Sequence, residues 1–126
     1  MVELIEIKTP APSALMLGAQ AMSRCAADLV AKKPGLAADL AERLPGAAAD
    51  LVRVATWLRF VALGADNLLE PSPLELCTAL SCLKYNYRAM PFVEGEDGDR
   101  AKLCLAAEFV SSTRSNGWKR DAALSL

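Results

Sequence analysis

Histidine is absent from the 126-residue sequence, which removes the side chain that most often serves as a general base or as a zinc ligand. No stretch approaches the roughly 18 uninterrupted apolar residues of a transmembrane helix, so we expect no association with a membrane. The sequence also lacks a Gly-rich phosphate loop and the usual groupings of catalytic residues. These absences favour a protein that is not an enzyme and that carries no cofactor.

An excess of charge of either sign is lacking as well. The 14 basic and 15 acidic residues give a formal net charge of −1, so the chain as a whole has little electrostatic drive to bind nucleic acid. The first residues, MVELIEIKTPAPS, contain no basic segment followed by an apolar run. We therefore expect no secretory signal and a cytoplasmic location.

The four cysteines are Cys25, Cys77, Cys82 and Cys104, and we expect free thiols rather than disulfides. They include no paired CxxC motif, which structural zinc sites usually have, so we predict no metal site. Helical spacing places Cys82 toward the outer side of its helix, where a thiol is open to reaction. The acidic run 94–99 does not match the spacing of a calcium-binding loop and is interpreted as a solvated turn.

Ala and Leu dominate the composition and aromatic residues make up only 6% of the chain, which favours closely packed helices over a β-sandwich. Apolar spacings of three and four residues predict helices over about 13–33, 36–44, 47–63, 72–88 and 100–114. We expect an all-α protein, a compact bundle of four to five helices packed around the third. The predicted organisation is an extended arm at 1–12, a helical domain at 13–117 and a C-terminal tail at 118–126. Residues 2–8 alternate loosely and allow a short N-terminal β arm.

Several helix ends carry their own signals. Ser72, Pro73 and Glu75 form the strongest one, with the serine as N-cap, the proline at the first helical position and the glutamate completing a capping box. Ser13 is the expected N-cap of the first helix. The sequence Ser115-Asn116-Gly117 is expected to end the last one.

The tetrapeptide Ala-Ala-Asp-Leu occurs three times, at 26–29, 37–40 and 48–51, with a step of eleven residues. Eleven residues make almost three whole helical turns, so the repeat places each Leu on the same side of a helix. One interpretation is an amphipathic array that lies on a lipid surface. The other is a local duplication of helical sequence, which the mixed charges favour.

The helix expected at 47–63 is apolar nearly all round, and this leaves more apolar surface than a small bundle needs to hide. We predict that Trp57 and Phe60 anchor another protein, with Arg53 and Arg59 on the rim, because aromatic and Arg side chains dominate interface energetics. The sequence thus predicts a non-enzymatic protein–protein interaction module. It would be an adaptor, an assembly chaperone or a small inhibitor of a larger complex, of the kind that phages and mobile elements encode, and a homodimer is compatible with it.

The alternative prediction concerns the segment 84–88. On a helix, Lys84 and Arg88 share a face and Tyr85 is adjacent, a combination that contacts phosphates and stacks on bases. This pattern favours a nucleic-acid-binding regulator that acts as a dimer through the Lys84–Arg88 face. The nearly neutral net charge weighs against this alternative.

Overall fold

The computed structural model describes residues 9–35, 38, 42, 43, 46–65, 68–90 and 98–124, with side chains in the last range up to Asn116. Within these residues the protein is all-α. The helices are α1 (Pro12–Val30), α3 (Ala47–Ala62), α4 (Pro73–Ala89) and α5 (Asp99–Leu124). The predicted arm at 2–8 lies outside the described residues, and so does most of the predicted helix at 36–44.

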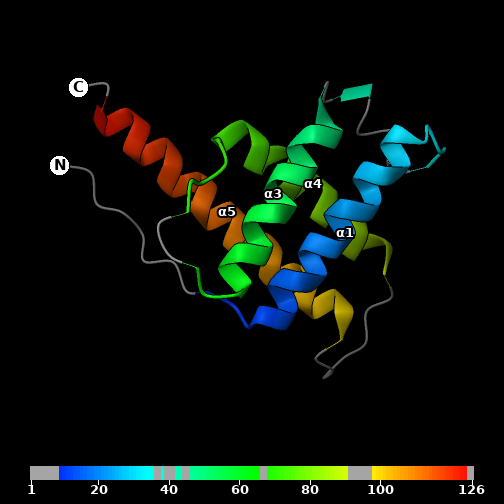
Figure 1. Cartoon of the computed structure of the whole chain (residues 1–126), viewed down its shortest axis with the longest axis horizontal. Helices are drawn as coiled ribbons and strands as arrows, with labels where there is room; N and C mark the ends of the chain where they lie inside the picture. Colours follow the sequence, from blue (N-terminus) through cyan, green and yellow to red (C-terminus); the bar gives the residue numbers. More distant parts are fainter. Residues whose placement is uncertain are drawn as a thin grey trace.

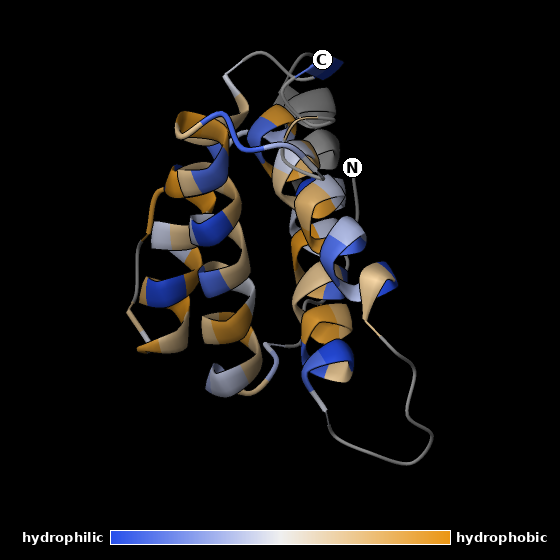
Figure 2. Ribbon diagram, turned by 90° about the vertical axis from the view of Figure 1, so that its right-hand side faces the viewer, coloured by the Kyte–Doolittle hydropathy of each residue, from blue (hydrophilic) through white to orange (hydrophobic). Residues whose placement is uncertain are grey.

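The four helices form two layers. Helices α1 and α3 run antiparallel in the front layer of Figure 1, and α4 and α5 run antiparallel behind them. Figure 2 shows the layers edge-on, with hydrophobic and hydrophilic bands alternating along the helices. The closest helix pairs are α1 with α3 and α4 with α5. The bundle predicted from the sequence is therefore confirmed in its architecture, with four described helices.

Helix α1, rather than the helix predicted at 47–63, occupies a central position. Both α1 and α4 pack against all three other described helices, whereas α3 packs mainly against α1 and α4. The physical reason lies in the small residues on the inner face of α1. A Cβ atom at Gly18 would lie 2.9 Å from the Cβ of Ala106, so the glycine lets α1 approach α5 more closely than any other residue would allow.

One hydrophobic core lies between the layers, and every described helix contributes to it. Trp57 on α3 stacks on Phe109 on α5, with the ring centroids 5.5 Å apart and the ring planes at 15°. The largest fully buried apolar side chains are Leu15, Met22, Leu51, Val54, Leu58, Leu76, Leu83, Leu103 and Val110.

The start of α4 confirms the strongest local prediction. The Oγ of Ser72 accepts a hydrogen bond from the backbone N–H of Glu75 at 3.2 Å, and the backbone N–H of Ser72 donates to Glu75 Oε1 at 2.9 Å. The expected start and end of α1 are wrong. Pro12 takes the first helical position, so Ala11 rather than Ser13 is the N-cap, and the helix ends at Val30 because Lys32 turns into the left-handed region at φ 55°.

The expected end of the last helix at Ser115-Asn116-Gly117 is also wrong, because α5 continues to Leu124. Thr113 and Asn116 are only 2% and 6% exposed, so packing against the rest of the molecule keeps this part of α5 helical. A glycine inside a helix costs only about 1 kcal/mol, which packing easily exceeds. The boundary predicted between the helical domain and the tail falls inside α5.

Candidate functional site

The two predicted aromatic anchors have different surroundings, although they lie on the same helix. Trp57 is 7% exposed and belongs to the core through its stack on Phe109. Phe60 is 48% exposed. A partner that docks on α3 would therefore contact Phe60, whereas Trp57 packs α3 against the core.

The two arginines predicted for the rim lie on either side of the exposed part of α3. The Nε of Arg53 forms an ion pair with Glu75 Oε2 on α4 at 3.1 Å. An Nη of Arg59 donates to the Oγ of Ser23 on α1 at 2.8 Å, which ties the two helices of the front layer together. Both guanidinium groups thus have partners within the chain.

The exposed side of the front layer is rich in apolar side chains. On α1 the exposed positions include Met16, Gln20, Arg24, Ala27 and Val30, and on α3 they include Ala49, Val52, Arg53, Thr56 and Phe60. Within each set the spacing of three, four or seven residues keeps the positions on one side of the helix. We call the apolar members of the two sets the hairpin face; they are Met16, Ala27, Val30, Ala49, Val52 and Phe60.

A groove of about 1000 Å³ lies at one end of the hairpin face, between the C-terminal part of α1 and the N-terminal part of α3. Small side chains dominate its lining, and Val30 and Val52 stand on its edges with 76% and 53% of their surface exposed. The lining residues are Ser23, Ala26, Ala27, Val30, Ala31, Ala48, Ala49, Asp50, Val52, Arg53 and Glu75.

The groove was not predicted, but the sequence carried a signal for it. The Ala-Ala pairs of the first and third repeats, at 26–27 and 48–49, lie opposite each other as groove lining. Since the two helices are antiparallel, the same tetrapeptide contributes small residues from both sides (Figure 1). The Leu of the third repeat, Leu51, is fully buried, as the eleven-residue step implies. Of the middle copy at 37–40, only Ala38 is among the described residues.

The groove carries charge where α3 meets α4. Asp50, Arg53 and Glu75 are its charged lining residues, so two carboxylates stand against one guanidinium. The hydroxyl of Thr78 donates to Asp50 Oδ2 at 3.3 Å. Thr78 itself is only 3% exposed, because α4 packs against three other helices.

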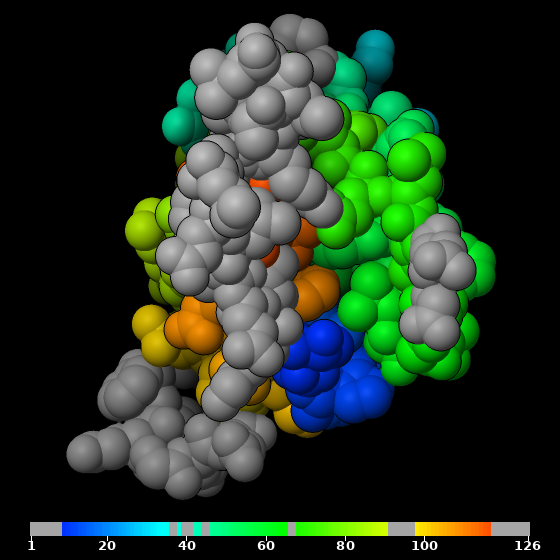
Figure 3. All heavy atoms as spheres, turned by 90° about the vertical axis from the view of Figure 1, so that its left-hand side faces the viewer, coloured from blue at the N-terminus to red at the C-terminus, as the bar shows by residue number. Residues whose placement is uncertain are grey.

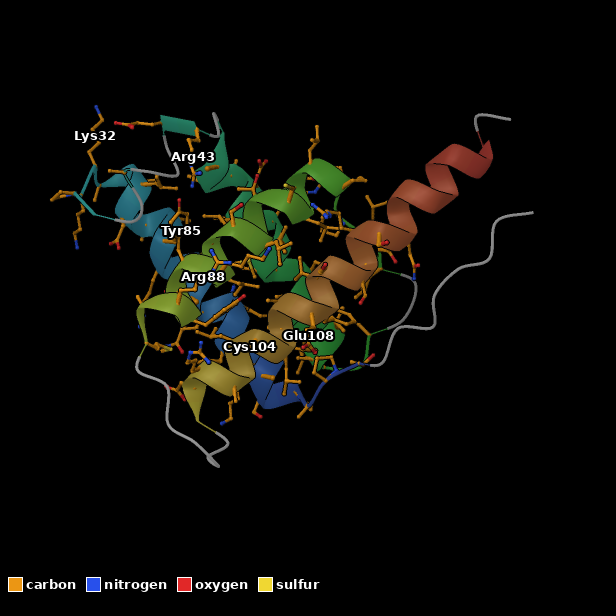
Figure 4. The ribbon with its side chains drawn as sticks, turned by 180° about the vertical axis from the view of Figure 1, so that it is seen from behind. Lys32, Arg43, Tyr85, Arg88, Cys104 and Glu108 are labelled. Carbon is orange, nitrogen blue, oxygen red and sulfur yellow. The ribbon has the colours of Figure 1, made fainter. Side chains whose placement is uncertain are left out.

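The residues of the nucleic-acid alternative lie on the other layer. Figure 4 shows Tyr85 and Arg88 along α4, with Arg43 beside Tyr85 and with Cys104 and Glu108 on the neighbouring α5. Lys84 and Tyr85 are partly exposed and Arg88 is exposed. Arg43 donates a hydrogen bond to the Tyr85 hydroxyl. Arg43 could not be predicted at this place from the sequence, because it lies 42 residues from Tyr85 along the chain.

All four cysteines are free thiols, and the prediction of an outward-facing Cys82 is wrong. Cys82 is fully buried, since α4 packs against three helices. A hydrogen bond between the thiols of Cys82 and Cys25 raises the pKa of Cys82, and burial raises it further. The same hydrogen bond lowers the pKa of Cys25 despite its burial. Among the described residues, no three cysteine or acidic side chains gather in a way that would hold a metal ion.

A smaller hollow of about 320 Å³ lies on the side of the molecule seen in Figure 3, where the start of α1 (blue), α5 (orange) and the segment after α3 (green) come together. The edges of Trp57 and Phe109 reach it. Its remaining lining residues are Thr9, Val61, Ala65, Leu68, Glu70 and Thr113.

Comparisons with known proteins found one short partial match. No protein-family model matches the chain, and no solved structure matches it. A human protein described as "Major facilitator superfamily domain-containing protein 12" is 39% identical over 62 residues, which cover 49% of this chain. The match spans only 13% of the human protein, so it does not show a shared family. Within the part of the chain that the structure describes, no helix has both the length and the apolar character to cross a membrane.

Proposed function

We propose that the protein is a non-enzymatic protein–protein interaction module, an adaptor, assembly chaperone or small inhibitor, which docks its partner on the hairpin face through Phe60. The observation that carries the proposal is the 48% exposure of this phenylalanine on a helix whose other aromatic residue is buried. A half-exposed aromatic ring flanked by arginines is the composition of an interface anchor. The free thiols agree with work in the reducing cytoplasm.

The neighbours of Phe60 support the proposal. Exposed Met16 and Val52 belong to the same face, and Thr56 lies between Val52 and Phe60 along α3 without adding charge. Single exposed apolar residues are ordinary on a protein surface, but a group of them on one side of two adjacent helices marks an interaction surface. Arg59 is held in place by Ser23 on α1, so a positioned cation lies at the border of the exposed side of α3.

The test is cross-linking from two matched positions. A photoreactive amino acid replaces Phe60 in one variant and Leu105, an exposed residue of α5 at 44%, in the other. We expect a partner from native-host extract to be joined to position 60 and not to position 105. The purified partner should then bind the wild-type chain and lose about tenfold or more of its affinity on Phe60→Asp, as for an interface anchor.

Circular dichroism of Phe60→Asp provides the control. Unfolding of that variant would place Phe60 among the residues that hold the fold. The same set of proteins joined to both positions would contradict a specific docking face. A cross-link from position 60 to a second copy of the chain, with a dimer in analytical ultracentrifugation, would assign the face to a homodimer instead.

A nucleic-acid-binding regulator is the second candidate, and the placement of Arg43 favours it. Tyr85 lies on α4, the helix that also carries Lys84 and Arg88, and Arg43 adds a cation beside the Tyr85 ring. A gel shift at roughly 50 mM salt is the decisive assay, because low salt strengthens every phosphate contact. Binding that disappears in the double variant Lys84→Glu and Arg88→Glu would support this candidate. The absence of any shift with duplex or single strands would remove it.

A further inference from the structure

We propose that the groove at the end of the hairpin face receives an amphipathic helix of the partner, and that a Lys or Arg of this helix meets Asp50 and Glu75. The inference rests on the proposed function and deepens it, because it states the chemistry of the partner. It concerns a part of the hairpin face that is distinct from Phe60.

The lining of the groove suits a helix. The alanines at 26, 27, 48 and 49 have the smallest side chains that still favour a helix, so they leave room for a third backbone to come close. A volume of about 1000 Å³ is at the upper end of the range of about 300–1,000 Å³ for ligand pockets. The groove is therefore large enough for several apolar side chains of a partner.

The surroundings of the groove favour a helix over an extended segment. Its walls are two antiparallel helices, and apolar residues spaced at i, i+3, i+4 and i+7 on a third helix can lie along such a surface. A peptide that binds by strand addition needs the edge of a sheet, and a polyproline segment docks in an aromatic-lined groove, whereas the described lining of this groove contains no aromatic residue. The described ranges contain helices and their connections without a strand, so they offer no such edge.

The charges of the groove determine the polar part of the partner. Arg53 neutralises one of the two carboxylates through its ion pair with Glu75, which leaves one negative charge unbalanced at this end. Among the described residues, Asp50 accepts a weak side-chain hydrogen bond from Thr78 at 3.3 Å, and the backbone carbonyl of Leu74, at 3.2 Å, competes for the same hydroxyl proton. A Lys or Arg on the partner would gain an opposite charge here, whereas an acidic residue would be repelled.

Selection from a peptide library tests the inference without knowledge of the natural partner. The probe is a display library of helical peptides of roughly 18 residues, about 27 Å long, with the apolar and charged positions randomised. We expect the enriched peptides to carry apolar residues at helical spacing and a basic residue near one end. Replacement of that basic residue by Glu should weaken binding about tenfold, and Asp50→Asn should weaken it in the same direction.

Two variants block the groove, and a third is their matched control. Ala27→Trp fills it from α1 and Ala49→Trp fills it from α3; both alanines are exposed, so the fold has room for the larger ring. Ala89→Trp makes the same change at an exposed alanine of α4. We expect either groove variant to abolish binding of the selected peptides, the control to retain it, and circular dichroism to show all three folded.

Three results would overturn the inference. The selected peptides could bind the groove variants as tightly as the wild type, the enriched set could lack the basic residue, or the selection could enrich no peptide at all. If the chain forms a dimer and Ala27→Trp dissociates it, the groove binds a second copy of this chain instead of a partner helix. If the groove variants still cross-link to the partner from position 60, the proposed function stands and only the helix-in-groove inference fails.

Discussion

The outer faces of the two helix layers differ far more than their inner faces do. Both layers contribute Leu, Val and Ala side chains to one core. On the outside, α1 and α3 expose Met16, Val30, Val52 and Phe60 beside the charged Arg24 and Arg53. Helices α4 and α5, within their described residues, expose only Leu74 and Leu105 among the large apolar side chains. Folding requires the inner faces alone, so the apolar character of one outer face is better explained by a partner than by the stability of the bundle.

The sharpest test of this comparison lies within α3 and has the largest expected effect. Trp57→Ala should lower the free energy of unfolding by about 3–5 kcal/mol, because it removes a buried ring and leaves a cavity beside Phe109. Phe60→Ala should cost less than about 1 kcal/mol, since half of that ring already contacts water.

Urea denaturation followed by circular dichroism measures both values, with an unchanged m value as a sign of two-state unfolding. A similar loss for the two variants would mean that Phe60 stabilises the fold as much as Trp57 does. The contrast between an inner and an outer aromatic residue on α3 would then be lost.

A second prediction concerns the contact between the layers. Gly18→Ala should destabilise the protein by about 1–3 kcal/mol, because the new methyl group would lie 2.9 Å from the Cβ of Ala106, which has no flexible side chain to move away. The better helix propensity of alanine, about 1 kcal/mol, offsets only part of this cost. Gln20→Ala, on the exposed side of the same helix, is the control and should leave the midpoint nearly unchanged.

The sequence predicted those features that depend on neighbours in the chain. The capping box of Ser72 and Glu75 involves residues three apart, and the inner stripe of α1 follows from helical spacing alone. The burial of Cys82 was not predictable in this way, because it depends on how many helices surround α4. Spacing could not distinguish Trp57 from Phe60 either, since both lie on the broad apolar side of one helix.

The central place of α1 and the groove required knowledge of tertiary structure. Gly18 becomes informative only when α5 is known to lie against it. The Ala-Ala-Asp-Leu repeat was visible in the sequence, but its meaning depends on an antiparallel arrangement that brings residues 26–27 and 48–49 to opposite sides of one groove. The charge at the groove likewise combines Asp50 of α3 with Glu75 of α4.

A third, smaller effect tests the local signal in the back layer. Ser72→Ala should cost about 1 kcal/mol, because the backbone N–H of Glu75 loses its acceptor at the start of α4. Ser72→Asp should restore most of the loss, since aspartate also accepts from the first turn and its charge suits a helix N-terminus. Equal destabilisation by both variants would indicate that the serine hydroxyl has another role.

The smallest effect on stability is expected for Arg53, which lies at the apolar outer face of α1 and α3. Its ion pair with Glu75 joins a side chain that is 56% exposed to one that is 20% exposed, so Arg53→Ala should change the free energy of unfolding by less than about 1 kcal/mol. Binding of a basic-ended helical peptide should become tighter, because both carboxylates of the groove would then face the peptide without a competing guanidinium. Titration of the labelled peptide at two salt concentrations measures this, and the gain should shrink at higher salt. Weaker binding would instead mean that Arg53 contacts the partner directly, as its predicted place on the rim of the interface implies.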